Sequence, residues 1–81
     1  KEKLAMVERA EDLLREQGFR QFRVRIHGTN ARIELLPEDI PRMLDSELRK
    51  EIVDKLKRYG FTYVSLDLEG YRTGSMNEVL A

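Results

Sequence analysis

The sequence predicts a small α+β domain in which two helices cover one face of a three-stranded mixed sheet. Apolar residues recur at spacings of three and four in two segments and alternate with polar residues in three others. The segments follow one another in the order helix, strand, strand, helix, strand. With 81 residues, the chain is long enough for a single two-layer domain spanning residues 1–81.

The chain begins with a segment that has the pattern of an amphipathic helix. Its apolar stripe consists of Leu4, Met6, Val7, Ala10, Leu13 and Leu14. Charged residues fill the other face. Gly18 follows the last turn, where a glycine suits the left-handed conformation that ends many helices. The helix is therefore expected to end just before Gly18.

Two strands are expected next, joined by a short turn. In FRVRIH, residues 22–27, apolar residues alternate with arginine and histidine, and ARIELL, residues 31–36, resumes the alternation. Between them, HGTN supplies Gly28 and Asn30, which both tolerate positive φ. Two alternating runs separated by such a turn predict a β-hairpin.

A short helix and a long helix are expected after the hairpin. In PEDIP, Pro37 suits the first turn of a short helix, and Pro41 is expected to limit its length. Asp45 is the predicted N-cap of the long helix, with Glu47 in the first turn, where the helix dipole favours an anion. Gly60 is expected to end it. The apolar stripe of this helix consists of Leu44, Leu48, Ile52, Val53, Leu56 and Tyr59.

The third strand is predicted in FTYVSLDL, residues 61–68. Its apolar side chains face one way: Val64, Leu66 and Leu68. A helical crossover implies that the second and third strands run parallel, whereas the tight turn makes the first two antiparallel. We expect strand 22–27 in the middle of the sheet and both helices on its apolar face. Residues 68–81 follow as a loop tail without periodicity.

Composition limits the class of protein. Fifteen basic and fifteen acidic residues give zero net charge, which argues against a nucleic-acid partner and against a polybasic membrane anchor. No cysteine is present, so a disulfide framework, a thiolate metal site and a cysteine nucleophile are excluded. Neither a signal peptide nor an apolar run of roughly 20 residues occurs, which favours a cytoplasmic location away from membranes. Because the helical pattern is already established at Leu4 and no methionine precedes Lys1, we expect a piece of a larger protein.

Period-two alternation gathers polar side chains on the face of the sheet away from the helices. They are Arg23, Arg25, Arg32, Glu34, Tyr63, Ser65 and Asp67, with His27 at the rim. One interpretation is a solvated face with cross-strand ion pairs of about 0.2–1 kcal/mol each. The other is an anion site, because Arg23 and Arg25 point the same way about 7 Å apart and two guanidinium groups can grip a phosphate or carboxylate. Glu34 could orient an arginine or help to hold a cation.

Other candidate residues carry weaker signals. His27 is the only histidine and lacks a convincing second ligand, so it is interpreted as a rim or turn residue. Asp67 and Glu69 could support a divalent cation, but the pattern is more typical of ordinary surface. Neither a phosphate-binding glycine loop nor a nucleophile elbow is present. We therefore predict no catalytic residue and no metal site in this chain.

Two longer stretches carry a family resemblance. They are RVRIHGTNARIEL and IPRMLDSELRKEIVDKLKRYGFTYVSLDLEGYRTGSMNEVL, which contain the signatures R-x-R…A-R-I-E and G-[YF]-x-Y-V-x-L-D-L-x-G-Y-R-x-G-S-M-N. Over roughly residues 18–80 the chain resembles the C-terminal region of the LarE family. These are ATP-dependent sacrificial sulfur transferases of the PP-loop ATP pyrophosphatase superfamily.

The resemblance implies a parent enzyme with an N-terminal PP-loop domain that uses ATP and Mg. In the family this enzyme adenylates a substrate carboxylate and then transfers sulfur, from a cysteine or from an iron–sulfur cluster, during biosynthesis of the nickel-pincer nucleotide cofactor. The family's PP-loop and its sulfur-donor cysteine are both absent here. The fragment alone is therefore expected to bind no cofactor and catalyse no reaction.

Site residues and partners are also implied by the resemblance. Arg23 and Arg25 match a phosphate-binding element, Glu34 matches an acidic position beside it, and Arg72 in the Gly-Tyr-Arg stretch matches a further substrate contact. The expected partners are the parent's PP-loop domain, a phosphate-bearing nucleotide substrate and further copies in a homo-oligomer. The GYRTGSMN tail is expected to fold over the parent's active-site cleft or a subunit contact.

Two alternative functions remain open at this point. The chain could be a purely structural protein-interaction module in which the arginines form only salt bridges. It could also be a small RNA-binding α+β domain. Zero net charge disfavours the RNA-binding function, as does the isolation of Tyr63 as the one aromatic residue expected on the open face.

Overall fold

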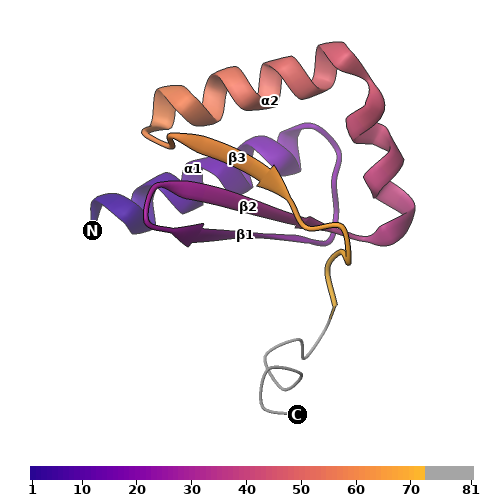
Figure 1. Cartoon of the computed structure of the whole chain (residues 1–81), viewed down its shortest axis with the longest axis horizontal. Helices are drawn as coiled ribbons and strands as arrows, with labels where there is room; N and C mark the ends of the chain where they lie inside the picture. The colour runs from indigo at the N-terminus through magenta and orange to yellow at the C-terminus, as the bar shows by residue number, and fades with distance from the viewer. Residues whose placement is uncertain (73–81) are drawn as a thin grey trace.

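A computed structural model describes residues 1–72 and has the predicted order of elements (Figure 1). The elements are α1 (Glu2–Glu16), β1 (Phe22–His27), β2 (Asn30–Leu35), the 3-10 helix η1 (Pro37–Leu44), α2 (Ser46–Tyr59) and β3 (Tyr63–Leu66). Most of the expected tail, including Gly74, lies outside the described residues, so its predicted folding over a cleft stays a prediction.

The sheet is mixed, with β2 as its central strand. β1 pairs antiparallel with β2 in a register that sets Arg23 opposite Glu34 and Arg25 opposite Arg32. β3 pairs parallel with the other side of β2, with Ser65 opposite Arg32. The predicted pairing directions are confirmed, but the expected central position of strand 22–27 is wrong.

At the outer edge of β1, a side chain of α1 takes the place of a neighbouring strand at one backbone donor. The backbone N–H of Val24 donates to the carboxylate of Glu11 at 3.3 Å, so this donor is satisfied without a further strand. Arg23 and Arg25 also place charge on this strand, and charge is one means by which proteins keep an edge from pairing. The returning β3 therefore takes the unoccupied side of β2.

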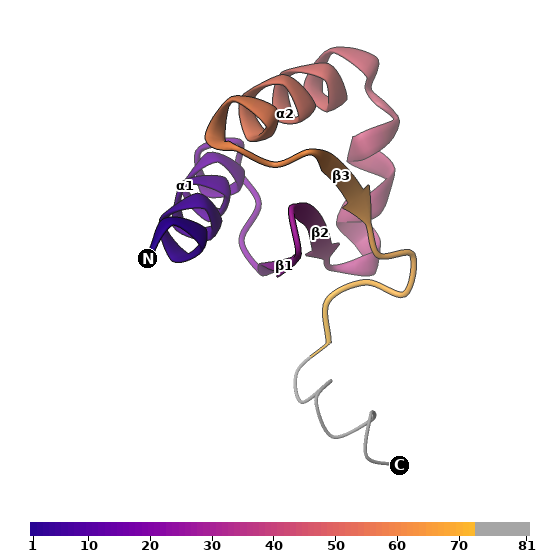
Figure 2. The same cartoon turned by 60° about the vertical axis from the view of Figure 1, so that its left-hand side comes forward.

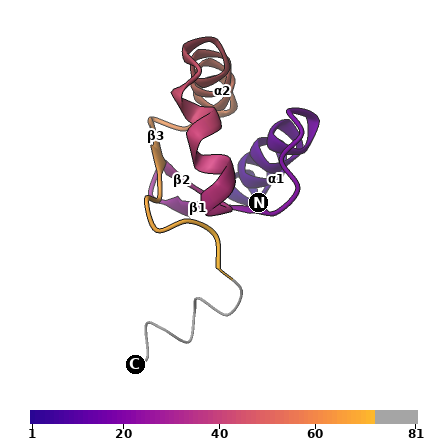
Figure 3. The same ribbon diagram turned by 90° about the vertical axis from the view of Figure 1, so that its right-hand side faces the viewer.

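The helices all lie on one face of the sheet, as the view along its edge shows (Figure 3). α1 packs against β1, while α2 contacts α1, η1 and β3, and together they arch over the sheet (Figure 2). The predicted two-layer α+β fold is thus confirmed. Its core consists of Ala10, Leu13, Leu14, Phe19, Val24, Ala31, Ile33, Leu35, Met43, Ile52, Leu56 and Phe61.

The helix ends agree with the predicted capping residues. The Asp45 side chain accepts a hydrogen bond from the Glu47 N–H at 3.1 Å, as an N-cap does. Gly60 ends α2 with φ +118°, and Gly18 follows α1 with φ +95°. A side chain is strained at such φ values, so glycine allows each chain reversal that brings the following strand onto the sheet.

Three local expectations are wrong. Pro41 lies inside η1 instead of ending it. Because 3-10 hydrogen bonds span three residues, one missing donor interrupts this short segment less than it would an α-helix. Leu44 is 79% exposed because Asp45 is extended and breaks the helical phase before α2. Leu68 is 83% exposed because β3 ends at Leu66.

Leu44 and Leu56 share the spacing of the predicted stripe but differ in burial, which makes them a matched pair. Leu56 has no exposed surface, so Leu56→Ala should lower the free energy of unfolding by about 2–5 kcal/mol. Leu44→Ala should change it by less than about 0.5 kcal/mol. Urea denaturation followed by circular dichroism measures both values. Similar losses for the two variants would contradict the described packing of α2.

Candidate functional site

The open face of the sheet brings together the charged side chains that the alternation predicts. Arg25 on β1 and Arg32 on β2 both pair with Glu34, and Arg32 also approaches Asp67 just after β3. Arg23 lies two residues before Arg25 and shares its face. The cluster therefore crosses the whole sheet, from one edge strand to the other.

Glu34 is the centre of this cluster. Its residue surface is only 4% exposed, and its Oε2 atom lies 3.2 Å from Arg25 Nε and 3.2 Å from Arg32 Nη2. A carboxylate removed from water needs such charged donors to offset its lost hydration. Sequence periodicity put Glu34 on this face but did not indicate its burial, which comes from the two arginine side chains beside it.

Arg32 connects the buried carboxylate to the third strand. Its Nε atom is 3.7 Å from Asp67 Oδ2, which is an ion pair but too long for a hydrogen bond. Among the residues that the structure describes, this Nε is a buried donor without a hydrogen-bond partner. Arg32 was not among the predicted site residues. The A-R-I-E spacing, with Arg32 and Glu34 at i and i+2 on one face, is the signal that identifies it.

Arg23 differs from Arg25 and Arg32 in its partners. It is exposed, and no ion pair within residues 1–72 includes it, although it lies directly opposite Glu34 in the register. Its guanidinium carbon instead lies 5.9 Å from the centre of the Tyr71 ring. The predicted Arg23–Arg25 pair is therefore brought to one face, but only Arg25 has the buried carboxylate as its partner.

The segment after β3 returns to the end of β2. The Tyr71 N–H donates to the Leu35 carbonyl at 2.6 Å, and Gly70 adopts φ +90° in the preceding turn. Arg72, which the resemblance implies as a substrate contact, forms an ion pair with Glu69 at 2.9 Å. Tyr71 was not predicted as a site residue, because its place beside Arg23 depends on this turn.

The chemistry available on this face is electrostatic. Arg23, Arg25 and Arg32 outnumber the neighbouring carboxylates of Glu34 and Asp67, which leaves a surplus of positive charge on the open face. Phosphate, sulfate or a carboxylate are the ligands that such donors suit. In the described part of the chain, no group of three or more His, Cys, Asp or Glu side chains is arranged to hold a metal ion.

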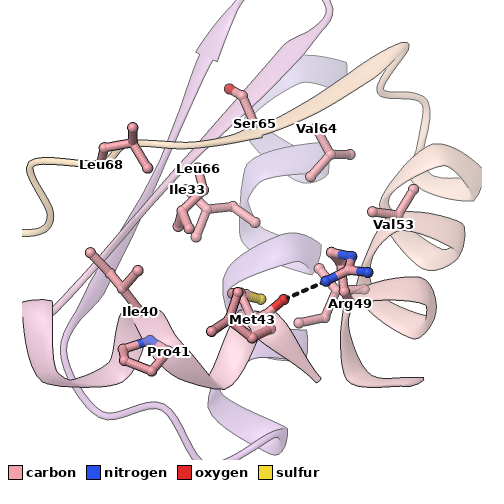
Figure 4. Close-up of a pocket in the computed structure, with 12 residues that line it drawn as sticks. Ile33, Ile40, Pro41, Met43, Arg49, Val53, Val64, Ser65, Leu66 and Leu68 are labelled. Atoms are coloured by element: carbon pink, nitrogen blue, oxygen red, sulfur yellow. Dashed lines mark hydrogen bonds between the residues drawn. The ribbon is translucent and has the colours of Figure 1, made fainter. Parts of the chain in front are cut away.

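A second feature is an apolar groove of about 460 Å³ between η1, α2 and β3 (Figure 4). Its lining includes Ile40, Met43, Val53, Val64, Leu66 and Leu68. Arg49, whose guanidinium donates to the Met43 carbonyl at 2.9 Å, and Ser65 are its polar side chains. The lining carries no catalytic constellation and instead suits the packing of an apolar surface.

Fold and site together define a small α+β domain with an arginine-rich sheet face, and comparisons with known proteins place it further. No family model matches the chain. It is 48% identical over 79 residues to slr1717, an uncharacterised protein of Synechocystis sp., covering 98% of this chain and 30% of that protein. It is 46% identical over 78 residues to pyridinium-3,5-bisthiocarboxylic acid mononucleotide synthase of Lactiplantibacillus plantarum, covering 95% of this chain and 27% of that protein.

These identities show that nearly the whole chain is homologous to one part of that synthase, LarE, and the predicted resemblance is confirmed to this extent. The chain spans less than a third of the length of either relative. Across residues 1–72, no helix combines the length and the apolar character that crossing a bilayer requires.

Removal of the Glu34 charge should destabilise the domain. In Glu34→Gln the two arginines keep their charge but lose the buried carboxylate, and we expect a loss of about 1–3 kcal/mol in the free energy of unfolding. The control is Glu69→Gln, because Glu69 also pairs with an arginine but its side chain is 73% exposed. That change should cost less than about 1 kcal/mol. Equal effects in urea denaturation would contradict the central role of Glu34.

Proposed function

We propose that the chain is a C-terminal accessory domain that binds the phosphate of a nucleotide substrate for an ATP-dependent sulfur transferase of the PP-loop superfamily. One observation carries this proposal. Arg23 lies next to Arg25 on the open face and has no ion-pair partner within residues 1–72, in a chain homologous to part of a mononucleotide synthase. The product named for that synthase is a mononucleotide and so contains a phosphate.

In this proposal, two parts of a larger enzyme have separate roles. This chain contains no cysteine, so a sulfur-donor cysteine would lie elsewhere in the parent, as would the site for ATP and Mg. The parent's N-terminal PP-loop domain would activate the substrate, while the sheet face described here would hold its phosphate. A cytoplasmic location and assembly into a homo-oligomer belong to the same proposal and rest on the resemblance to the family.

Each side chain has a distinct part in the proposed site. Arg23 and Arg25 would donate to the phosphate oxygens, since two guanidinium groups on one strand face can share a single anion. Glu34 accepts from Arg25 Nε at 3.2 Å and so orients that guanidinium. Arg72 would add a further contact once its pairing with Glu69 is replaced by the ligand.

Phosphate binding by the complete 81-residue chain tests this proposal. Arg23→Ala/Arg25→Ala should weaken the binding of inorganic phosphate by about tenfold or more, because each lost charge-assisted hydrogen bond is worth about 1.5–3 kcal/mol. Lys57→Ala/Arg58→Ala removes the same charge from the exposed end of α2 and should leave the affinity unchanged. Chemical-shift titration by NMR measures both affinities.

The same test can be extended to the parent enzyme. The corresponding double arginine substitution in a full-length homologue should lower sulfur transfer. Loss of Arg25 beside the buried Glu34 should also lower its unfolding temperature, so turnover is measured at a temperature at which a thermal melt shows the variant to be folded. Equal phosphate affinity in the wild-type and double-arginine chains would overturn the proposed site, as would undiminished turnover.

The apolar groove favours a second candidate function, an interaction module. The curated relatives are more than three times as long as this chain, so most of their polypeptide lies outside the region described here. We propose that part of that polypeptide packs into the groove, where Leu44 and Leu68 are 79% and 83% exposed. This contact is compatible with phosphate binding on the opposite face.

A charged residue introduced into the apolar groove tests the interaction-module function separately from phosphate binding. Leu68→Asp should abolish association with the remaining part of the parent, produced separately and mixed with this chain, because an unpaired carboxylate would be buried in the contact. Leu4→Asp is the control, since Leu4 is 63% exposed on α1 and is not part of the groove lining. Isothermal titration calorimetry measures the association. Equal binding by both variants would exclude the groove as the contact surface.

A further inference from the structure

We infer that Tyr71 is a positioning residue of the anion site, which holds the Arg23 guanidinium in place while leaving its charge available to a phosphate group. This inference rests on the proposed phosphate-binding function and adds a residue to it. It is carried by the ring contact with Arg23, by the anchoring of Tyr71 on β2, and by the different ways in which the two arginines of β1 are held.

The two arginines of β1 are held in place by different partners. Arg25 is held by Glu34, and this pairing offsets part of its positive charge. Arg23 lies over a neutral ring, with 5.9 Å between its guanidinium carbon and the ring centre of Tyr71. A cation within about 6 Å of a ring is attracted by the ring quadrupole. The ring therefore restrains Arg23 without neutralising it.

The Arg23 side chain gains from being restrained before a ligand binds. Arg23 is exposed on an edge strand, and a free arginine side chain has rotamer entropy to lose when it binds a ligand. A guanidinium that already lies over a ring has lost part of this freedom before the ligand arrives. Such preorganisation increases affinity because less entropy is lost on binding.

Tyr71 is itself anchored to the sheet. Its N–H donates to the Leu35 carbonyl at 2.6 Å, at the end of the strand that carries Glu34. The preceding Gly70 donates to the Asp67 carbonyl at 3.1 Å and has φ +90°. A Cβ atom at Gly70 would lie 2.8 Å from the Leu35 oxygen, so glycine is required for this close approach.

The anchor also explains why the ring reaches Arg23. In the β1–β2 register, Phe22 lies opposite Leu35 and Arg23 lies opposite Glu34. A residue hydrogen-bonded to Leu35 is therefore beside the row that contains Arg23. Two residues of the Gly-Tyr-Arg stretch therefore have structural roles. Gly70 permits the close approach to β2, and Tyr71 contacts the guanidinium of Arg23.

Two other aromatic residues provide comparisons within the same chain. Arg42 lies 4.0 Å from the Phe19 ring centre, but its guanidinium also donates to the Gln17 carbonyl at 2.6 Å, so this contact stabilises the loop after α1. Tyr63 is 69% exposed on β3 and makes no arginine–ring contact in the described region. Tyr63 is therefore the matched control for Tyr71.

The experiment titrates inorganic phosphate into the complete chain and its variants by NMR. Tyr71→Leu should weaken phosphate binding about two- to fivefold, the equivalent of a cation–π contact at an exposed site. Tyr71→Phe should retain the wild-type affinity because the ring face, and not the hydroxyl group, contacts Arg23. Tyr63→Leu should have no effect. Tyr71→Met provides a second ring-free variant if Tyr71→Leu does not fold.

A second readout reports the position of Arg23 without phosphate. The ring should shift the resonances of the Arg23 side-chain protons, and this shift should be lost in Tyr71→Leu and retained in Tyr71→Phe. Wild-type affinity in the ring-free variant, alongside weakened binding in Arg23→Ala/Arg25→Ala, would overturn the inference and leave the proposed function intact. A wild-type chain that binds no phosphate would overturn the proposed function and, with it, the inference.

Discussion

The buried carboxylate of Glu34 is the constraint on which the polar face of the sheet depends. A carboxylate that is 4% exposed must be compensated by charged donors, and Arg25 and Arg32 supply them from either side. These two guanidinium groups are therefore paired with the Glu34 carboxylate inside the cluster. In this way the requirement to compensate one buried charge leaves Arg23, on the edge strand β1, as the arginine of this face that has no ion-pair partner within residues 1–72.

The two edges of the sheet differ in the side chains beside them. At β1, the Glu11 carboxylate accepts from the Val24 N–H and charged residues line the strand, which discourages further pairing. At β3, no strand within the described residues covers the outer side, and an apolar groove lies beside it. The domain thus presents one polar face suited to an anion and one apolar edge suited to a protein surface.

Residues far apart in the sequence meet on the polar face because of two chain reversals. The hairpin after His27 sets Arg25 opposite Arg32, and the turn at Gly70 returns the chain to Leu35. Both reversals have glycine at a positive-φ position, +60° at Gly28 and +90° at Gly70, and at Gly70 a Cβ atom would also lie 2.8 Å from the Leu35 oxygen. Backbone conformation at two positions therefore assembles a cluster that comes from three separate segments.

The sequence alone determined the elements, their order and the sharing of a face by Arg23, Arg25 and Glu34, because hydrophobic period, capping residues and strand alternation are local properties. Only the tertiary structure decided that β2 is central, that Glu34 is buried and that Tyr71 lies against Arg23. Strand order depends on which edge is already occupied, here by Glu11, and the burial of Glu34 depends on Arg25 of the neighbouring strand as well as on Arg32 of its own strand. Such facts concern residues distant along the chain, and no local pattern records them.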